Sequence, residues 1–338
     1  MKPELIIVGA GLNGLLLAHL LQGHYRITLL EARPRIGGRI LTVEEAGERF
    51  DLGPTWVWPH QPHIRHLIDA LGLTLFRHYD QGAFAYDAPE GVQYFRTGQN
   101  APSYRIEGGA GMLTSSLAER LDDVDIRLET PVRTIVSDGG GIAVHTDGET
   151  LRAAHCIVTL PPRLCADTIA FEPPLAAPVR EKMLAIPTWM GFSSKCIVTY
   201  AEPFWRERGL SGFATSHRGP LSEVHDASTR NKGALFGFYH TRSADDAQAE
   251  RVIDQLTRLF GPEARDYEVF RYHNWRSDPY TSVPADREPL DAHPRYGMET
   301  AVSACLHFCG TETESQEGGY LEGAVIAAMR LAKTLIEA

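Results

Sequence analysis

The sequence is short of positive charge. Its 33 lysines and arginines stand against 43 aspartates and glutamates, which gives a formal net charge of −10 with histidine neutral. Proteins bind nucleic acids largely by neutralising phosphates with basic side chains, so this balance argues against a nucleic-acid partner. Cysteine is also scarce: the five cysteines form no CxxC pair and no cluster with histidines at zinc-ligand spacing. We therefore expect reduced, mostly buried cysteines, no metal site and no secreted disulfide scaffold.

Long apolar runs are lacking as well. The N-terminal stretch 2–21 could imitate a secretory signal, but Glu4, Asn13 and His19 interrupt it and no small-residue cleavage site follows. No uninterrupted apolar run approaches the ~18 to 20 residues that a membrane helix needs. We expect a cytoplasmic protein with no membrane partner, both ends of which belong to the folded domain.

The overall composition is that of a globular protein. Of 338 residues, 43% are hydrophobic and 22% charged, which excludes disordered, collagenous and coiled-coil classes. At roughly 150 residues per domain, the length predicts about two domains and allows a cleft between them.

Three glycines near the N-terminus lie where a strand meets a helix. The run 5–8 is typical of a buried strand, and 12–21 of a helix rich in leucine and alanine. Between and within them, Gly9, Gly11 and Gly14 form a G-x-G-x-x-G motif. The first glycine permits a tight turn, the second lets the backbone approach a pyrophosphate, and the third allows close helix packing. The motif predicts a dinucleotide at the N-terminus of the helix.

A carboxylate follows at the spacing that such a site needs. A second strand, 27–30, ends at Glu31, 22 residues after Gly9. There the side chain can accept hydrogen bonds from the adenosine ribose hydroxyls, and it would repel a 2′-phosphate, which disfavours NADP.

The segment that begins at Glu31 distinguishes FAD from NAD. It reads Glu-Ala-Arg-Pro-Arg-Ile-Gly-Gly-Arg, and it resembles the flavin-containing amine oxidase superfamily, which includes monoamine oxidases, polyamine oxidases and L-amino-acid oxidases. The chain is similar to a short bacterial-type member. The resemblance implies that Glu31, Ala32 and Arg33 contact the adenosine ribose and nearby groups, that Gly38 lies in the same wrap, and that Arg39 neutralises phosphate charge.

The resemblance recurs along nearly the whole chain. The stretch 51–56 is similar to the family's D-x-G-G segment beside the flavin, with proline in place of the second glycine, and 107–112 is similar to its glycine turn before a helix. Residues 131–162 resemble its hairpin and returning strand. Residues 308–313 and 319–324 are close to its most specific signature. The further cofactor-binding residues implied are Gly53, Pro54, Thr55, Val132, Gly310, Glu312 and Leu321.

Two of these residues have specific expected roles. The resemblance places Glu312 near the ribityl-phosphate portion of FAD. It also aims the Leu321 amide, at a helix N-terminus, at the flavin pyrimidine edge, where it would stabilise negative charge on reduction. Residues 109–111 do not form a second dinucleotide site, because no apolar strand precedes them and Thr114 stands where a glycine is needed. Electrons must therefore enter from an organic substrate and leave to oxygen or another acceptor.

The elements that resemble FAD-binding ones fall in three pieces, 1–72, 106–165 and 290–338. The remaining segments, 73–105 and 166–289, are then expected to build a substrate domain. The implied fold is α/β: a doubly wound, Rossmann-like FAD domain joined to an α+β substrate domain with an antiparallel sheet.

Local patterns within the second domain agree with this. Strand-like alternation occurs at 192–200 and 234–240, and a helical pattern at 243–260. Relatives carry a long helical section where only 73–105 stands here, so we expect a more open substrate cavity.

Two residues carry the catalytic expectation. Lys195 aligns with the family lysine that holds a water against flavin N5, where a cation would assist oxygen activation or flavin reoxidation. Tyr320 aligns with one wall of the aromatic pair that guides an amine to the flavin. The position of the second aromatic residue corresponds to about Ala285, which is not aromatic. The residue that is bonded covalently to FAD in monoamine oxidases corresponds to Pro284. The resemblance thus implies noncovalent FAD and an incomplete cage. Candidate substitutes for the lost wall are Trp56, Trp275 and Tyr280.

A polar pair in the second domain has two interpretations. Glu223 and His225 share one side if they lie on a strand. His225 could act as an acid or base, but a flavin amine oxidase requires no protein base, so a structural hydrogen bond is the favoured interpretation.

Together these features predict an FAD-dependent oxidoreductase that oxidises a C–N bond of an amine. A neutral nitrogen would support hydride transfer to flavin N5, with oxygen as acceptor, giving an imine and hydrogen peroxide. Two alternatives stay open. One is a desaturase or dehydrogenase of a nonpolar substrate, similar to protoporphyrinogen oxidase or carotenoid desaturases. The other is a non-catalytic flavin-binding sensor. Lys195 and Tyr320 favour the amine, and the missing wall keeps the first alternative open.

Overall fold

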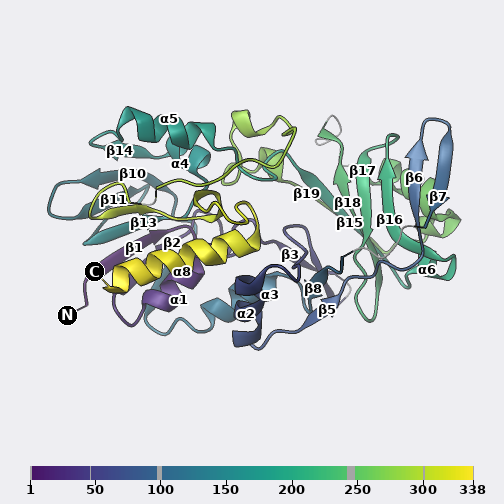
Figure 1. The fold of residues 1–338 in the computed structure, drawn as a ribbon, viewed down its shortest axis with the longest axis horizontal. Helices are drawn as coiled ribbons and strands as arrows, with labels where there is room; N and C mark the ends of the chain where they lie inside the picture. Colours follow the sequence, from purple (N-terminus) through teal and green to yellow (C-terminus); the bar gives the residue numbers. More distant parts are fainter. Residues whose placement is uncertain (1, 46, 97–100, 242–247, 300, 338) are drawn as a thin grey trace.

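The computed structural model describes residues 2–45, 47–96, 101–241, 248–299 and 301–337. Most strands gather into three sheets along an elongated molecule (Figure 1). A parallel sheet lies at the end that holds both termini, and a large sheet, antiparallel in all pairings but one, lies at the other end. The predicted fold class, with a Rossmann-like part and a second part built on a mainly antiparallel sheet, is confirmed.

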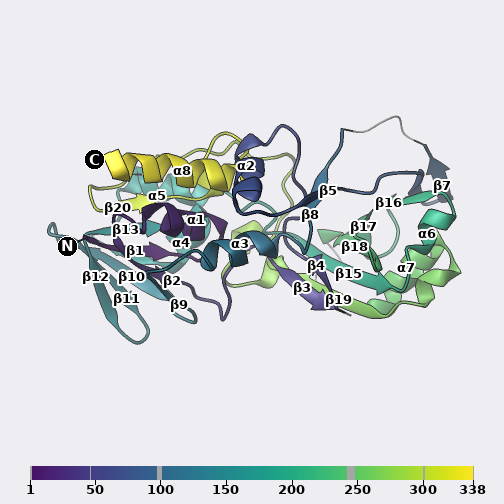
Figure 2. The same ribbon diagram turned by 90° about the horizontal axis from the view of Figure 1, so that it is seen from below.

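The parallel sheet has the strand order β20-β13-β1-β2-β9. Its strands are β1 (Glu4–Val8), β2 (Arg26–Leu30), β9 (Val124–Arg127), β13 (His155–Val158) and β20 (Leu306–Phe308). The helices α1 (Leu12–Leu21) and α8 (Leu321–Glu337) lie side by side against this sheet, as Figures 1 and 2 show. The first two predicted strands and the predicted first helix are thereby confirmed.

The side chains of β1 explain why this sheet is buried on both faces. Leu5 and Ile7 pack with α1 and α8, whereas Ile6 and Val8 point the other way and pack against a second, smaller sheet. This alternation follows from the two-residue period of a strand. A strand covered on both faces is apolar throughout, which is why its sequence is a continuous apolar run.

The smaller sheet has the order β12-β11-β10-β14. Its strands are β10 (Val132–Ser137), β11 (Ile142–Thr146), β12 (Thr150–Ala153) and β14 (Ala170–Glu172), and the helices α4 (Pro162–Thr168) and α5 (Ala177–Ala185) flank it. The predicted hairpin is present, with its turn at 138–141.

The large sheet has the order β19-β15-β18-β17-β16-β6-β7. Its strands are β6 (Ala83–Ala88), β7 (Gly91–Phe95), β15 (Ser194–Tyr200), β16 (Leu210–Ser216), β17 (Leu221–Asp226), β18 (Gly233–Tyr239) and β19 (Val269–Asn274). The helices α6 (Phe204–Glu207) and α7 (Ala249–Phe260) pack beside it. The strands predicted at 192–200 and 234–240 are confirmed. The helix predicted at 243–260 begins at Ala249, and residues 243–247 lie outside the described part.

Alternation along β15 decides where its lysine points. Cys196 and Val198 pack with α7 on one face of the large sheet. Ile197 packs on the opposite face, against Phe50 of β4 (Glu48–Asp51). Because side chains two apart share a face, Lys195 lies on the same face as Ile197, toward the first part of the chain.

Smaller elements connect the two ends of the molecule. They are the hairpin of β3 (Thr42–Glu45) and β4, the pair β5 (Leu75–Arg77) and β8 (Tyr104–Ile106), the helices α2 (Pro62–Ala70) and α3 (Gly111–Ala118), and the short helices η2 (Pro262–Arg265), η3 (Trp275–Ser277), η4 (Pro284–Asp286) and η5 (Thr311–Thr313). All five cysteines are free; four are buried and Cys305 is half-buried. Among the described helices, none has the length and apolarity to cross a membrane.

Candidate active site

The turn between β1 and α1 depends on glycine. Gly9 has a φ of +105°, and its N–H donates to the Leu30 carbonyl at 2.7 Å. A Cβ on Gly14 would lie 2.0 Å from the Gly9 carbonyl oxygen, so no side chain fits there. Gly11 is the N-terminal cap of α1. The turn therefore leaves the free amides of the helix N-terminus pointing toward a cavity, as an anionic pyrophosphate requires.

Glu31 is held at the end of β2 by two backbone amides. Its Oε2 accepts from the Ala10 amide at 2.9 Å, and its Oε1 accepts from the Arg33 amide at 2.9 Å. The side chain is only 4% exposed. Each carboxylate oxygen has a second lone pair, so the group can still accept a bond from a ribose hydroxyl.

One cavity of about 670 Å³ extends from this turn to the large sheet. Thirteen of the fifteen predicted cofactor-binding residues line it: Gly9, Gly11, Glu31, Ala32, Arg33, Gly38, Arg39, Gly53, Pro54, Thr55, Val132, Gly310 and Leu321. The predicted substrate-side residues line it as well: Trp56, Lys195, Trp275, Tyr280 and Tyr320. The volume is within the range of small-molecule sites.

The other two predicted residues act behind the cavity wall. Gly14 serves the packing of α1 against the turn. Glu312, 1% exposed, pairs with Arg39 through both oxygens, at 2.5 and 2.9 Å. Burial lowers the pKa of Arg39, but the Glu312 carboxylate more than compensates, so the pKa lies above its ordinary value. The guanidinium thus stays charged at the cavity wall, as a phosphate partner must.

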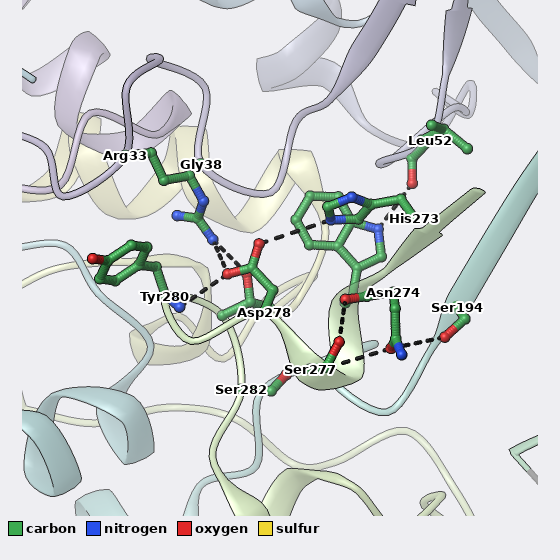
Figure 3. Close-up of polar contacts among 12 residues, drawn as sticks. Arg33, Gly38, Leu52, Ser194, His273, Asn274, Ser277, Asp278, Tyr280 and Ser282 are labelled. Carbon is green, nitrogen blue, oxygen red and sulfur yellow. Dashed lines mark hydrogen bonds and ion pairs between the residues drawn. The ribbon is translucent and has the colours of Figure 1, made fainter. Parts of the chain in front are cut away.

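Asp278 links the loop that follows β19 to Arg33 (Figure 3). Its Oδ1 accepts from Arg33 Nη2 at 2.6 Å and from the Tyr280 amide at 2.9 Å. Arg33 Nη2 also donates to Thr281 Oγ1 at 2.8 Å. This carboxylate was not among the predicted site residues. The sequence offers one local signal, which is the aspartate itself. In turns, aspartate commonly accepts a bond from the amide two residues on, as in an Asx turn.

Tyr280 lies at the nucleotide end of the cavity. The Arg33 Cζ is 5.5 Å from the centroid of its ring, and the ring is 39% exposed. No ring contact between Tyr280 and Tyr320 occurs among the described residues. Tyr280 therefore lies at the Glu31 end of the cavity. It does not contact Tyr320 and does not replace the missing aromatic residue beside it.

The other two candidate walls also have neighbours of their own. Trp275, 4% exposed, donates from its indole N–H to the Leu52 carbonyl at 2.9 Å. Trp56 packs on the ring of His225 at 4.7 Å and on Phe236 at 5.3 Å. Both line the cavity, but neither ring contacts Tyr320 among the described pairs.

Lys195 is buried at the large-sheet end of the cavity. Its side chain is 6% exposed, and Nζ donates to the Gly53 carbonyl at 2.6 Å. The ammonium lies 4.4 Å from the centroid of the Phe238 ring. Burial lowers the pKa of Lys195 to about 8, although the carboxylates of Asp51 and Glu223 raise it. A lysine with such a pKa can be either charged or neutral near physiological pH.

Tyr320 is surrounded by three rings that sequence reasoning missed. Trp58 meets it at 6.0 Å and an interplanar angle of 80°, and Trp189 at 6.1 Å and 59°. His293, which is exposed, stacks on it at 5.1 Å and 2°. Burial, with a smaller effect of Glu317, raises the pKa of Tyr320. These rings come from three separate loops, so no sequence pattern joins them.

The polar pair on β17 does not reach the cavity lining. His225 Nε2 bonds to Glu223 Oε1, and the His225 ring stacks on Phe236 at 5.0 Å. Burial raises the pKa of Glu223, but its bond to His225 outweighs this and leaves the pKa lowered. The pair makes the structural hydrogen bond that the sequence favours.

A Rossmann-type turn, a carboxylate at the end of the second strand and a cavity leading to a buried lysine define a dinucleotide-dependent oxidoreductase. Comparison with protein families gives the class its name. The family described as "Flavin containing amine oxidoreductase" matches residues 88–336, and "NAD(P)-binding Rossmann-like domain" matches residues 7–71. The chain belongs to the flavin-containing amine oxidoreductase family, and it is an FAD-dependent oxidoreductase acting on a small molecule.

Individual relatives are distant but similar over their full length. The chain is 24% identical to putrescine oxidase of Kocuria rosea, over 97% of this chain and 95% of the relative, and 24% identical to L-amino acid dehydrogenase of Synechocystis, over 98% and 94%. A solved structure of wild-type putrescine oxidase bound to putrescine has a TM-score of 0.84 at 21% identity and covers 100% of both chains. The alignment to the Kocuria protein runs over 456 positions, whereas this chain has 338 residues, so the relative carries more than a hundred residues that this chain lacks.

Proposed function

We propose that this enzyme oxidises the C–N bond of a small amine, by hydride transfer to N5 of noncovalently bound FAD, with oxygen as the electron acceptor. The products are an imine, which water hydrolyses, and hydrogen peroxide. One observation carries the proposal: a single cavity is lined by the Gly9 turn and also by Lys195 and Tyr320. The names of the relatives, a putrescine oxidase and an L-amino acid dehydrogenase, support nitrogen-bearing substrates.

The cavity fits FAD in its chemistry. A Cβ on Gly14 would strike the turn, Glu31 keeps free lone pairs, and Arg39 supplies a fixed positive charge. We assign the cofactor to residues 1–72, 106–165 and 290–338, and the substrate to 73–105 and 166–289. The structure corrects the second boundary, because β14 and α5, which lie within 166–289, pack with the smaller sheet beside the parallel sheet. Bound FAD supplies the two-electron oxidation. Pro284 is exposed and does not line the cavity, and no cysteine lines it among the described residues, which supports noncovalent binding.

The charges that line the cavity favour a substrate whose amine nitrogen is neutral. Among the described lining residues, Glu31 is the one carboxylate, and two backbone amides hold it at the nucleotide end. The lining also includes the buried Lys195, whose charge would repel an ammonium group. A neutral amine keeps the nitrogen lone pair that supports loss of hydride from the adjacent carbon. Lys195 donates one of its three N–H groups to Gly53 and can offer the others to a water or to oxygen.

Anaerobic flavin bleaching tests the proposal directly. The FAD-loaded protein is mixed without oxygen with benzylamine, putrescine, L-amino acids and a nonpolar alkene. We expect loss of flavin absorbance with at least one amine, then its recovery with formation of hydrogen peroxide when oxygen is admitted. Bleaching by the alkene alone would support the desaturase alternative. Absence of bleaching by every compound would support the sensor alternative and overturn the proposal.

A further inference from the structure

The short helix that should carry the second aromatic wall faces away from the cavity. In η4, Pro284 and Ala285 are exposed, and neither lines the cavity. The Ala285 carbonyl accepts a bond from Arg163 at 3.1 Å. A ring placed on Ala285 would therefore extend into solvent, so this helix supplies no second wall.

Trp189 lies in the turn before β15 and lines the cavity together with Tyr320. The two ring centroids are 6.1 Å apart and the rings are inclined at 59°, so they form a corner. The indole packs directly on the backbone before Tyr320: a Cβ on Gly319 would lie 2.9 Å from the Trp189 Cγ. Gly319 also has a φ of +87°, which a larger residue rarely adopts. The glycine thus makes room for the indole beside Tyr320.

The turn that carries Trp189 is fixed by the same short helix. Asp286, 3% exposed, accepts from the Thr188 amide at 2.9 Å and from the Thr188 hydroxyl at 3.1 Å. Arg163 donates to Asp286 at 2.7 Å and balances its charge. Met190, the next residue after Trp189, has a φ of +59°. A non-glycine residue in this region is strained, and such strain persists where the surroundings hold it, frequently at functional sites.

Trp58 and His293 are the competing rings. His293 stacks on Tyr320 at 5.1 Å and lies 4.5 Å from the Trp189 ring, but it does not line the cavity. Trp58 lines the cavity, meets Tyr320 nearly perpendicularly, at 80°, and is part of a chain of contacts through Trp56 to His225. This packing braces Tyr320 from the side of α2. Trp189 instead lies on the segment that continues into β15 and Lys195, and both residues line the cavity.

We propose that Trp189 forms the second wall of the substrate site. This inference rests on the proposed amine oxidation. An apolar substituent on the amine would lie in the corner between Trp189 and Tyr320, where aromatic faces stabilise both apolar groups and partial positive charge.

Two measurements on the FAD-loaded enzyme test the wall separately from the chemistry. The first is calorimetric binding of cumylamine (2-phenylpropan-2-amine), which has no hydrogen on the carbon beside nitrogen and so cannot be oxidised. The second is the benzylamine concentration that half-saturates anaerobic flavin reduction. The variants are Trp189→Ala, Trp189→Phe, Trp58→Phe and, as a matched control outside the cavity, Trp205→Phe. Trp205 is fully buried behind the large sheet and does not line the cavity.

Trp189→Ala should weaken cumylamine binding and raise the half-saturating benzylamine concentration about tenfold, because the phenyl group loses an aromatic neighbour. Trp189→Phe, which keeps a ring, should recover most of the loss. If the alanine variant does not fold, Trp189→Leu, which keeps apolar bulk without a ring, replaces it and should show the same weakening. Trp205→Phe should leave both values unchanged. Wild-type binding in Trp189→Phe and Trp189→Ala, or a larger shift in Trp58→Phe, overturns the wall. Cumylamine binding that depends on Trp189, without bleaching by any amine, supports the wall and refutes the proposed reaction.

Discussion

Replacing Lys195 by methionine should stabilise the flavin-free protein at neutral pH while impairing the enzyme. The ammonium is buried, and burial lowers its pKa from 10.5 to about 8. That difference corresponds to about 3 kcal/mol of unfavourable free energy for the charged form in the folded state. Methionine is of similar length and removes the charge. It also loses the hydrogen bond to Gly53 and the contact with Phe238, each worth about 1 kcal/mol, so we expect a net gain of about 1 kcal/mol at pH 7.

The effect of Lys195→Met on the free energy of unfolding should depend on pH. The folded-state pKa of Lys195 is below the unfolded one, so the unfolded chain binds the proton more tightly. The unfavourable contribution is complete below about pH 8 and disappears as pH rises toward 10.5. It falls from about 3 kcal/mol at pH 7 to about 1 kcal/mol at pH 9.5. The stability of Lys195→Met relative to the wild type should therefore fall by about 2 kcal/mol between pH 7 and pH 9.5, from a gain of about 1 kcal/mol to a loss of about 1 kcal/mol.

Urea unfolding of the flavin-free proteins at pH 7 and pH 9.5 measures the effect. The matched control is Lys333→Met, because the Lys333 side chain is 74% exposed and its replacement should give the same small difference at both pH values. A Lys195→Met effect that does not change with pH would refute the buried-charge reasoning. In the loaded enzyme, we expect wild-type reoxidation by oxygen to slow above about pH 8 and reoxidation of Lys195→Met to be slow at every pH. Unchanged reoxidation in the variant would refute the proposed role of the lysine.

Three further predictions concern the cofactor site and the thiols. Gly14→Ala should abolish FAD binding, since its Cβ would lie 2.0 Å from the Gly9 carbonyl oxygen, whereas Gly23→Ala, with no atom within 4 Å, should bind FAD normally in a fluorescence titration. Glu31→Gln should weaken FAD binding about tenfold, because the neutral amide accepts weaker hydrogen bonds from the two backbone amides and from a ribose hydroxyl than the carboxylate does. Equal FAD affinity in the variant would show that Glu31 does not bind the cofactor. Titration with a thiol reagent should modify only Cys305 in the folded protein and all five cysteines in denaturant, because the other four are buried; rapid reaction of more than one thiol in the folded protein would contradict this packing.

The sequence by itself determined the nucleotide end of this protein. The G-x-G-x-x-G turn, its flanking strand and helix, and Glu31 all lie within about thirty residues, and their geometry follows from local rules of turns and helix termini. The resemblance added Lys195 and Tyr320, which the fold brings to the same cavity. Features of this kind can be recognised in a single sequence because each depends on residues that are close together in the chain.

Only the tertiary structure decided the reacting end. Tyr280, a predicted substitute wall, lies beside Arg33 because Asp278 holds its loop at the nucleotide end. Trp189, which the sequence did not single out, contacts Tyr320 across more than a hundred residues of chain. A side chain's role as a wall depends on which loops the two sheets bring together, and such contacts between distant segments follow no short-range period or spacing. That is why the motif and the resemblance predicted the cofactor, and the packing of loops decided which rings surround Tyr320.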